Sequence, residues 1–126
     1  MTARARPAVT AVVLSALLGA MGAVAAGAVD PLLFVDGVEV QVRPSTPPAV
    51  FVRVHGLLMD GCSSVGTVSQ QRDGRRVTVT IRVRHTGATT CTMIGGVVDE
   101  IVRLEGSFGP GDYTLTVNGL SRDFRL

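Results

Sequence analysis

The sequence has 126 residues, of which 46% are hydrophobic, and a formal net charge of +2. A chain of this length has room for one domain. Arg4 and Arg6 account for the charge excess, because the chain from Val29 onward carries ten arginines, no lysine and ten acidic residues. This neutrality, together with only four phenylalanines and one tyrosine, argues against nucleic acid as a partner.

Residues 1–28 are expected to form a signal peptide, and residues 29–126 a single domain. Arg4 and Arg6 provide a positive start, no charge follows as far as Val29, and small residues allow cleavage after Ala25 or Ala28. The alternative is a retained membrane anchor, since about 20 apolar residues can span a bilayer. The membrane is then a partner only through the uncleaved signal segment. The sequence therefore predicts a protein that is secreted or located in the periplasm or cell envelope.

The first part of the domain predicts a hairpin, a turn and a further strand. Asp36-Gly37 separates two runs of strand formers, residues 32–35 and 38–42, and Asp-Gly suits the positive φ angles of a two-residue turn. Residues 44–48 contain three prolines, which lack the donor that a β-ladder needs. In residues 49–56, valines alternate with larger or polar residues, as in a half-buried strand.

The central part of the domain, residues 62–91, predicts a second hairpin around Asp73-Gly74. Closing the loop on those two residues pairs Arg72 with Arg75 and fixes the whole register. The core face then carries Val68, Val77, Val79, Ile81 and Val83, while serines, threonines and arginines meet water.

Two cysteines mark the open end of this central hairpin. The register carries Cys62 to the core face opposite His85, six residues before Cys91. The chain can fold back over that distance and bring the sulfurs together, so we expect a Cys62–Cys91 disulfide. In the chain-entropy model such a bond contributes about 3 to 4 kcal/mol, and it fits an oxidising compartment.

The last part of the domain predicts a strand, a turn and a third hairpin. Residues 97–104 have β composition, but Asp99 and Glu100 interrupt the alternation, so a β-bulge is expected there. Residues 106–111 are glycine-rich and form a turn. Asn118-Gly119 predicts a two-residue hairpin with Arg122 as the exception on its inner face, which otherwise carries Tyr113, Leu115, Val117, Leu120, Phe124 and Leu126.

The pattern as a whole is all-β. After the first 28 residues no stretch shows helical periodicity, and about seven to eight short strands recur with turn signals between them. Such a chain is typical of an antiparallel β-sandwich or barrel. The valine-rich inner faces, without a long ligand-cavity pattern, favour a β-sandwich in residues 29–126.

Several short motifs lie in sequence between Phe51 and Leu126. They are Gly56-Leu57, Asp60-Gly61-Cys62, Gln71-Arg72-Asp73-Gly74, Val77-Thr78-Val79-Thr80, Cys91-Thr92, Pro110-Gly111-Asp112-Tyr113-Thr114 and Val117-Asn118-Gly119. In this order they resemble small exported bacterial immunoglobulin-like β-sandwich domains, a mostly uncharacterised family. The resemblance implies an immunoglobulin-like fold with Tyr113 as a tyrosine corner, and it implies little about function.

Soft metal donors gather near one predicted end of the sandwich: His55, Met59, Cys62, His85, Cys91 and Met93. Such donors suit copper in an exported protein, so a copper-binding envelope protein is one hypothesis. Their spacing matches no zinc or blue-copper pattern, and a disulfide occupies both thiolates. We therefore predict no metal site and no cofactor.

The sequence contains no recognised arrangement of catalytic residues. Ser63 and Ser64 lie outside any Gly-x-Ser-x-Gly elbow. Asp99 and Glu100 are adjacent on a strand, so they point to opposite faces and cannot form a hydrolase pair unless a bulge intervenes. We predict that the protein is not an enzyme.

The arginines of the central hairpin form the candidate binding face: Arg72, Arg75, Arg76, Arg82 and Arg84. On the outer side or tip of the hairpin they could bind phosphate or carboxylate groups of an envelope polymer or a protein. The alternative is that these charges only keep the sheet soluble and discourage edge pairing.

These observations favour an exported, non-enzymatic β-sandwich module that binds a protein or cell-envelope component through its loops or a sheet edge. The alternative is an extracellular protease inhibitor that presents a disulfide-anchored loop near Cys62 or residues 86–90. Copper binding is the third hypothesis.

Overall fold

The computed structural model describes residues 2–3 and 29–126, so the expected signal peptide lies almost wholly outside the described residues. No helix in the described part is long and apolar enough to cross a membrane. The domain has seven strands: β1 (Phe34–Arg43), β2 (Ala49–Leu57), β3 (Ser63–Asp73), β4 (Arg76–His85), β5 (Val97–Arg103), β6 (Asp112–Val117) and β7 (Leu120–Arg125).

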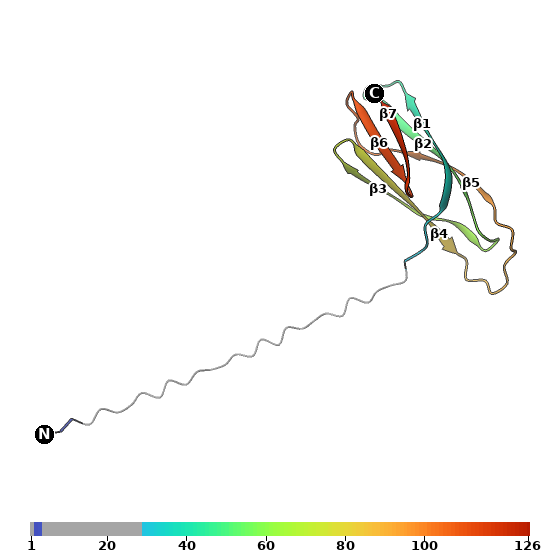
Figure 1. Ribbon diagram of the computed structural model, residues 1–126, viewed down its shortest axis with the longest axis horizontal. Helices are drawn as coiled ribbons and strands as arrows, with labels where there is room; N and C mark the ends of the chain where they lie inside the picture. Colours follow the sequence, from blue (N-terminus) through green and yellow to red (C-terminus); the bar gives the residue numbers. More distant parts are fainter. Residues whose placement is uncertain (1, 4–28) are drawn as a thin grey trace.

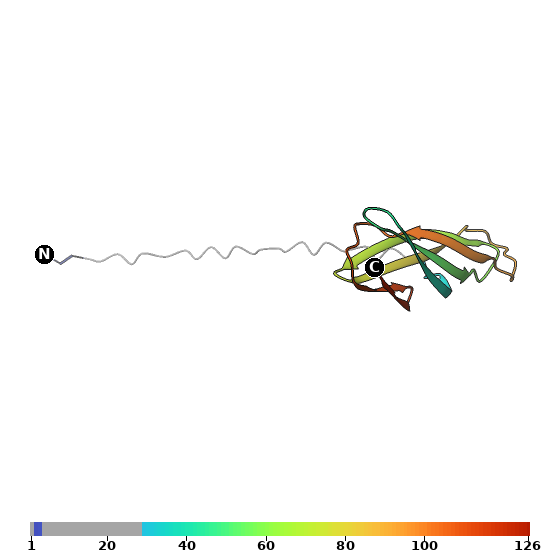
Figure 2. The ribbon, with the colours of Figure 1, turned by 90° about the horizontal axis from the view of Figure 1, so that it is seen from above.

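The strands form two sheets packed face to face, shown from two perpendicular directions in Figures 1 and 2. One sheet has the order β1-β2-β5 and the other β3-β4-β6-β7. The fold class predicted from the sequence, an all-β sandwich of seven to eight strands, is confirmed. One pair departs from the antiparallel expectation, because β4 and β6 run parallel. After β4 the chain crosses to the other sheet as β5. It then returns as β6, which pairs with the edge of β4 opposite β3 and runs in the same direction as β4.

The hairpin expected at Asp36-Gly37 is wrong, because residues 34–43 form the single strand β1. The register between β1 and β2 shifts between Val35 and Gly37, so Asp36 is the extra residue of a β-bulge. A bulge and a two-residue turn both return Val35 and Val38 to the same face, so alternation alone does not separate them. Here β2 is long enough to pair on both sides of Asp36.

The central hairpin forms between β3 and β4, but the predicted register is wrong. Its turn consists of Gly74 and Arg75, and Asp73 pairs with Arg76. Only Gly74 of the two turn residues has a positive φ, 59°, which matches a turn with glycine at its first central position. Near the turn, each residue of β3 pairs with a residue of β4 two positions further along the chain than predicted. Because alternate residues of a strand share a face, the predicted core face of β4 is unchanged: Val77, Val79 and Ile81 are buried.

The last three strands differ from the prediction at β5 and agree with it at the β6–β7 hairpin. β5 pairs with β2 without a register shift, so the bulge expected in residues 97–104 is absent. The hairpin at Asn118-Gly119 is confirmed, since β6 and β7 pair from Val117–Leu120 outward and both turn residues have positive φ. Arg122, which was predicted to be the polar exception on the apolar inner face of this hairpin, is exposed.

The core lies between the sheets, and its members with no exposed surface come from β2, β4 and β6: Val52, Val54, Val79, Ile81, Leu115 and Val117. Aromatic rings close the core at the β6–β7 end. The rings of Tyr113 and Phe124 stack with centroids 5.2 Å apart, and Phe108 meets Tyr113 edge-on at 5.4 Å. The Tyr113 hydroxyl donates to the Gly109 carbonyl at 2.8 Å.

Candidate functional site

The cysteine pair predicted from the sequence lies at disulfide distance. The two Sγ atoms of Cys62 and Cys91 are 2.06 Å apart, and their Cα atoms 5.4 Å apart. Cys62 lies in the loop 58–62, and Cys91 in the loop 86–96. Each of these two crossing loops carries the chain from one sheet to the other. The bond therefore links two crossings between the sheets, in addition to the open end of the β3–β4 hairpin.

Backbone contacts hold the two crossing loops together beside the disulfide. Leu58 N donates to the Gly96 carbonyl at 2.9 Å, and Gly61 N donates to the Thr92 carbonyl at 3.0 Å. Two glycines make this approach possible. A methyl group on Gly61 would overlap Thr92 Oγ1, and one on Gly95 would overlap the Leu58 carbonyl oxygen. The crossing loops are therefore a closely packed unit.

Asp60 fixes the start of β3 from within the first crossing loop. Its Oδ1 accepts from Ser63 Oγ at 2.8 Å and from Cys62 N at 2.9 Å. These hydrogen bonds, above all the one from the Ser63 hydroxyl, hold the pKa of Asp60 below its usual value. The ionised carboxylate thus orders the turn that leads into the disulfide.

Exposed apolar side chains gather around these loops. Met93 is 93% exposed, Ile94 83% and Met59 79%, so three large apolar side chains lie almost wholly in solvent. Phe34, Leu57 and Val97 lie at neighbouring positions across β1, β2 and β5, and all three are exposed. We name this surface the apolar end and define it as Leu32, Phe34, Leu57, Met59, Met93, Ile94 and Val97.

The apolar end includes a shallow cavity of about 240 Å³. Its walls come from the chain before β1, from the end of β2 and from β4, with Leu32, Phe34, Leu57, Met59 and Val83 as apolar lining. Figure 1 shows the crossing loops at the same end of the domain as the entry of the chain into β1, with the C-terminus at the other end. This surface was not predicted, although the apolar residues Met59, Met93 and Ile94 in loop segments were a signal available in the sequence.

The structure brings some of the soft metal donors together and separates others. Donor atoms of Asp60, Cys62, His85 and Cys91 all lie within 4.8 Å of one another. The sulfurs are bonded to each other, and His85 Nδ1 accepts from Gly87 N at 3.0 Å, which leaves the proton on the Nε2 that faces Cys91. The bonded sulfurs are not the thiolates that Zn²⁺ or copper binds, and the lone pair on His85 Nδ1 is already used by Gly87 N.

The remaining soft donors lie apart from this cluster. His55 Nδ1 contacts Asp36 Oδ1 at 2.6 Å on the outer face of the three-stranded sheet, and Met59 and Met93 extend into solvent. The copper hypothesis grouped all of these side chains, and the geometry does not favour that grouping.

The hydroxyl and carboxylate groups considered for catalysis have other partners. Ser63 donates to Asp60, whereas a nucleophilic serine would donate to a histidine. Asp99 accepts from Arg53 at 2.9 Å and 2.6 Å on the outer face, and Glu100 points to the opposite face, across from Val54. The hydrogen bonds from Arg53 lower the pKa of Asp99, and those to Asp99 raise the pKa of Arg53.

The five arginines of the candidate binding face do not form one surface. Arg72 lies on the core side of β3, where its guanidinium covers the Phe108 ring at 4.2 Å and donates to the Ser107 carbonyl at 2.7 Å. Arg82 donates to the Asp30 carbonyl at 2.7 Å. Arg84 is exposed opposite Ser64. Arg72 lies near the tip of the hairpin, two residues before Gly74, and the aromatic rings attract its guanidinium to the sandwich edge.

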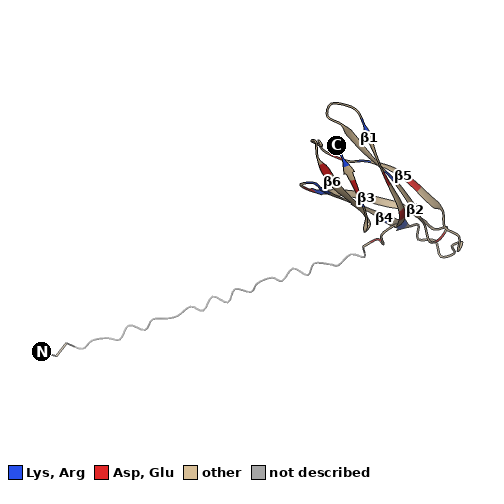
Figure 3. Ribbon diagram, turned by 45° about the horizontal axis from the view of Figure 1, so that its top comes forward, with Lys and Arg blue, Asp and Glu red and all other residues tan. Residues whose placement is uncertain are grey.

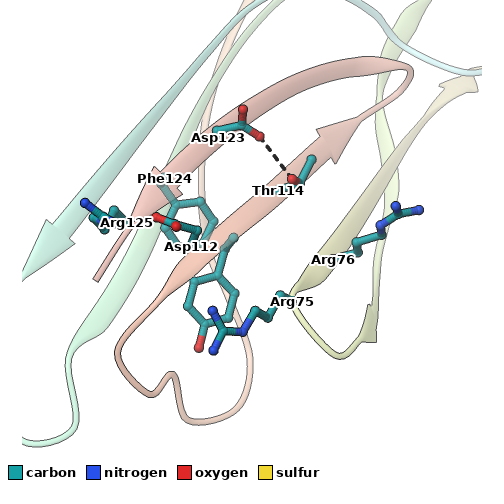
Figure 4. Close-up of a pocket in the computed structure, with 8 residues that line it drawn as sticks. Arg75, Arg76, Asp112, Thr114, Asp123, Phe124 and Arg125 are labelled. Atoms are coloured by element: carbon teal, nitrogen blue, oxygen red, sulfur yellow. Dashed lines mark hydrogen bonds and ion pairs between the residues drawn. The ribbon is translucent and has the colours of Figure 1, made fainter.

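Arg75 and Arg76 line an open pocket of about 580 Å³ beside β6 and β7, drawn in Figure 4. Asp112 and Asp123 also line it; Arg125 pairs with Asp112 at 2.8 Å, and Thr114 donates to Asp123 at 3.0 Å. Figure 3 shows basic and acidic positions interspersed over the domain. Three arginines and two aspartates make this pocket a mixed-charge surface, so it is a weaker anion site than an arginine cluster.

Comparison with known proteins places the chain in a family. It is similar to an uncharacterized 10.2 kDa protein in the HgiCIIM 5′ region of Herpetosiphon aurantiacus, 28% identical over 94 residues, which are 75% of this chain and 100% of the relative. Proteins in the HgiBIM and HgiEIM 5′ regions of the same organism are each 26% identical over 82 residues, 65% of this chain and 100% of each relative. No solved structure matches the chain.

A family model adds to these relatives. The model described as the ORF11 beta-sandwich domain matches residues 52–126, which is more than half of the chain. The matched segment begins within β2 and includes both crossing loops and the disulfide. The chain therefore belongs to the ORF11 beta-sandwich domain family.

Proposed function

We propose that this chain is an exported, non-enzymatic β-sandwich module that binds a protein or a cell-envelope component through its apolar end. The observation that carries this proposal is the exposure of Met59, Met93 and Ile94 on crossing loops that a disulfide, two backbone hydrogen bonds and two glycines hold in place.

Energetic arguments support this use of the apolar end. Fully burying one large apolar side chain contributes about 1.5 to 3 kcal/mol, and binding energy at interfaces is concentrated in a few such residues. Loops that are already ordered lose little conformational entropy on association. Three exposed anchors on packed loops therefore fit a recognition surface better than they fit a surface without a partner.

Two other aspects of the proposal have their own support. Export is supported by the uncharged segment before Val29 and by the cysteine pair, since disulfides persist in oxidising compartments. An immunoglobulin-like relationship is supported by the Tyr113 hydroxyl, which donates to the backbone at Gly109 as a tyrosine corner does.

The test is a capture experiment on envelope extract from the producing cell, with the full chain as bait. The wild type is compared with the triple variant M59Q/M93Q/I94T, which removes apolar surface from side chains that are 79% to 93% exposed and so leaves the core intact. We expect a component retained by the wild type to be lost by the triple variant, and a titration of that purified component to show the same loss.

The matched control is V42T/V68T, which removes apolar surface from two exposed valines outside the apolar end. This control should retain the component as the wild type does. Equal retention by the triple variant and the wild type would contradict the proposal, as would equal loss from the control.

A further inference from the structure

We infer that the partner of the apolar end is a serine endopeptidase with an apolar primary specificity pocket, and that the loop 92–94 enters its active-site cleft with Met93 in that pocket. This inference rests on the proposed function, because it names the class of protein that the apolar end binds. It is argued from the exposure of Met93, from the supports on both sides of it and from the chemistry of its side chain.

Met93 has the exposure that a protease requires of a residue in its specificity pocket. The chain bends at Met93, and the side chain is 93% exposed, more than that of Ile94 or Met59. A protease takes an exposed segment into its cleft and buries one side chain in its primary pocket. A long, unbranched thioether is apolar and flexible enough to enter a narrow apolar pocket. The carboxylate at the base of a trypsin-like pocket would not recognise it.

A disulfide and a backbone hydrogen bond hold the chain just before Met93. Cys91 is joined to Cys62, and the Thr92 carbonyl accepts from Gly61 N at 3.0 Å. Thr92 Oγ1 donates to the Ile94 carbonyl at 3.3 Å, so a side-chain hydrogen bond spans the Met93 position. The approach to Met93 is thus tied to the first crossing loop by one covalent and one hydrogen bond.

Supports also follow Met93. The Gly96 carbonyl accepts from Leu58 N at 2.9 Å, Gly95 packs against the Leu58 carbonyl with no room for a side chain, and β5 begins at Val97. Both sides of the Met93–Ile94 peptide bond are therefore held by the same segment, residues 58–62. A loop held on both sides binds without a large loss of conformational entropy.

The same supports turn a substrate-like loop into an inhibitor. Attack of the protease serine on the Met93 carbonyl would break the Met93–Ile94 bond, leave Met93 as an acyl-enzyme and pass the serine proton to the Ile94 amine; one water must then hydrolyse the acyl-enzyme to complete cleavage. Because Thr92 and Gly96 remain bonded to residues 61 and 58, the two new ends stay close together in the cleft. The amine can then attack the acyl-enzyme and restore the peptide bond with release of the serine, so net turnover is slow.

The experiment titrates the full chain, with its disulfide intact, against chymotrypsin and subtilisin, which have apolar primary pockets, and against trypsin. We expect stoichiometric inhibition of at least one apolar-pocket enzyme and none of trypsin. M93G should weaken that inhibition by at least about 100-fold, because it removes the anchor. M93K should transfer inhibition to trypsin, whose pocket binds a basic side chain.

The matched control is V42T/V68T, at the two exposed valines outside the apolar end, which should leave inhibition within about threefold of the wild type. The melting temperatures of all variants verify that they are folded. The inference is overturned by an absence of inhibition across the panel, by rapid cleavage after Met93, by unchanged inhibition in M93G, or by a failure of M93K to inhibit trypsin.

Two further outcomes separate this inference from the proposed function. If the panel is not inhibited but M59Q/M93Q/I94T still loses the captured component, the protease inference is wrong and the binding module stands. If the same triple variant instead loses binding to phosphatidylglycerol vesicles and no protease is inhibited, the partner is a lipid surface and the protease inference is equally wrong.

Discussion

Asn118 does more than form the turn between β6 and β7. Its Oδ1 accepts from Ile81 N at 2.9 Å, and its Nδ2 donates to the carbonyls of Leu33 at 2.8 Å and Ile81 at 2.9 Å. Its φ of 46° is one that asparagine adopts more readily than most residues. One turn side chain thus joins three segments that lie far apart in the sequence: the start of the domain, β4 and the last hairpin.

The variant N118G tests this role, since glycine keeps the positive φ and removes only the side chain. We expect the free energy of unfolding to fall by about 2 to 3 kcal/mol, because Ile81 N and the Leu33 carbonyl lose their partner. Urea denaturation measures the change. S121A in the same hairpin, at an exposed hydrogen bond between Thr116 and Ser121, should cost under about 0.5 kcal/mol. Equal stability of N118G and the wild type would show that water replaces these bonds.

At the scale of elements, the two crossing loops pack closely against each other. Leu58, Gly61, Thr92, Gly95 and Gly96 bring the two loop backbones together. Loops that connect sheets usually tolerate substitution and insertion. These two should not, because each supplies the surface against which the other is ordered.

The variant G95A should disturb this packing, because its methyl group would overlap the Leu58 carbonyl oxygen and no flexible side chain can move aside. We expect a loss of about 1 to 3 kcal/mol in unfolding free energy, as for other overpacked sites. Thermal and urea denaturation provide the measurement. G109A is the control, since a methyl group on Gly109 meets nothing within 4 Å. An effect of G95A no larger than that of G109A would mean that the loops separate at little cost.

At the scale of the whole molecule, the disulfide ties together two of the connections that link the two sheets. It joins the crossing from β2 to β3 with the crossing from β4 to β5. The third crossing, from β5 to β6, lies among the aromatic rings of Phe108, Tyr113 and Phe124. The two sheets are thus connected by a covalent bond at one end and by a ring cluster at the other.

The variant C62S/C91S removes the covalent connection. For a sequence separation of 29 residues, we expect a loss of about 3 to 4 kcal/mol in unfolding free energy from the greater entropy of the unfolded chain. The comparison is by urea denaturation of the variant and the wild type without reductant. Addition of reductant should bring the wild type to the stability of the variant and leave the variant unchanged. A wild type that reductant does not destabilise would contradict this role.

Local patterns predicted much of the fold. The alternating valines of β2, the core face of β4 and the Asn118-Gly119 turn all depend on neighbouring residues, and all are found. The two Asp-Gly pairs show the limit. Asp36 lies in a β-bulge and not in a turn, and the central turn consists of Gly74 and Arg75 and not of Asp73 and Gly74. The pairing strand selects among the conformations that an Asp-Gly pair permits.

Long-range placement could not be predicted in this way. Phe34 and Val97 lie in apolar runs beside the buried Leu33 and Val98, and only the arrangement of the sheets shows that both are exposed. Arg72 is exposed near the tip of its hairpin, and no local pattern indicates that its guanidinium lies over the Phe108 ring, 36 positions further along the chain. The apolar end exists only once β1, β2, β5 and both crossing loops are assembled.

The parallel pairing of β4 with β6 has a consequence for how the chain folds. Hairpins such as β3–β4 and β6–β7 can close locally within microseconds, whereas a parallel pair needs its long connection to be ordered first. Arg76 pairs with Thr114 and Phe51 with Arg103, so the sheets are completed by contacts between distant parts of the chain. Folding of this domain is therefore expected in milliseconds to seconds, with its three local antiparallel pairs, β1–β2, β3–β4 and β6–β7, formed before the sheets.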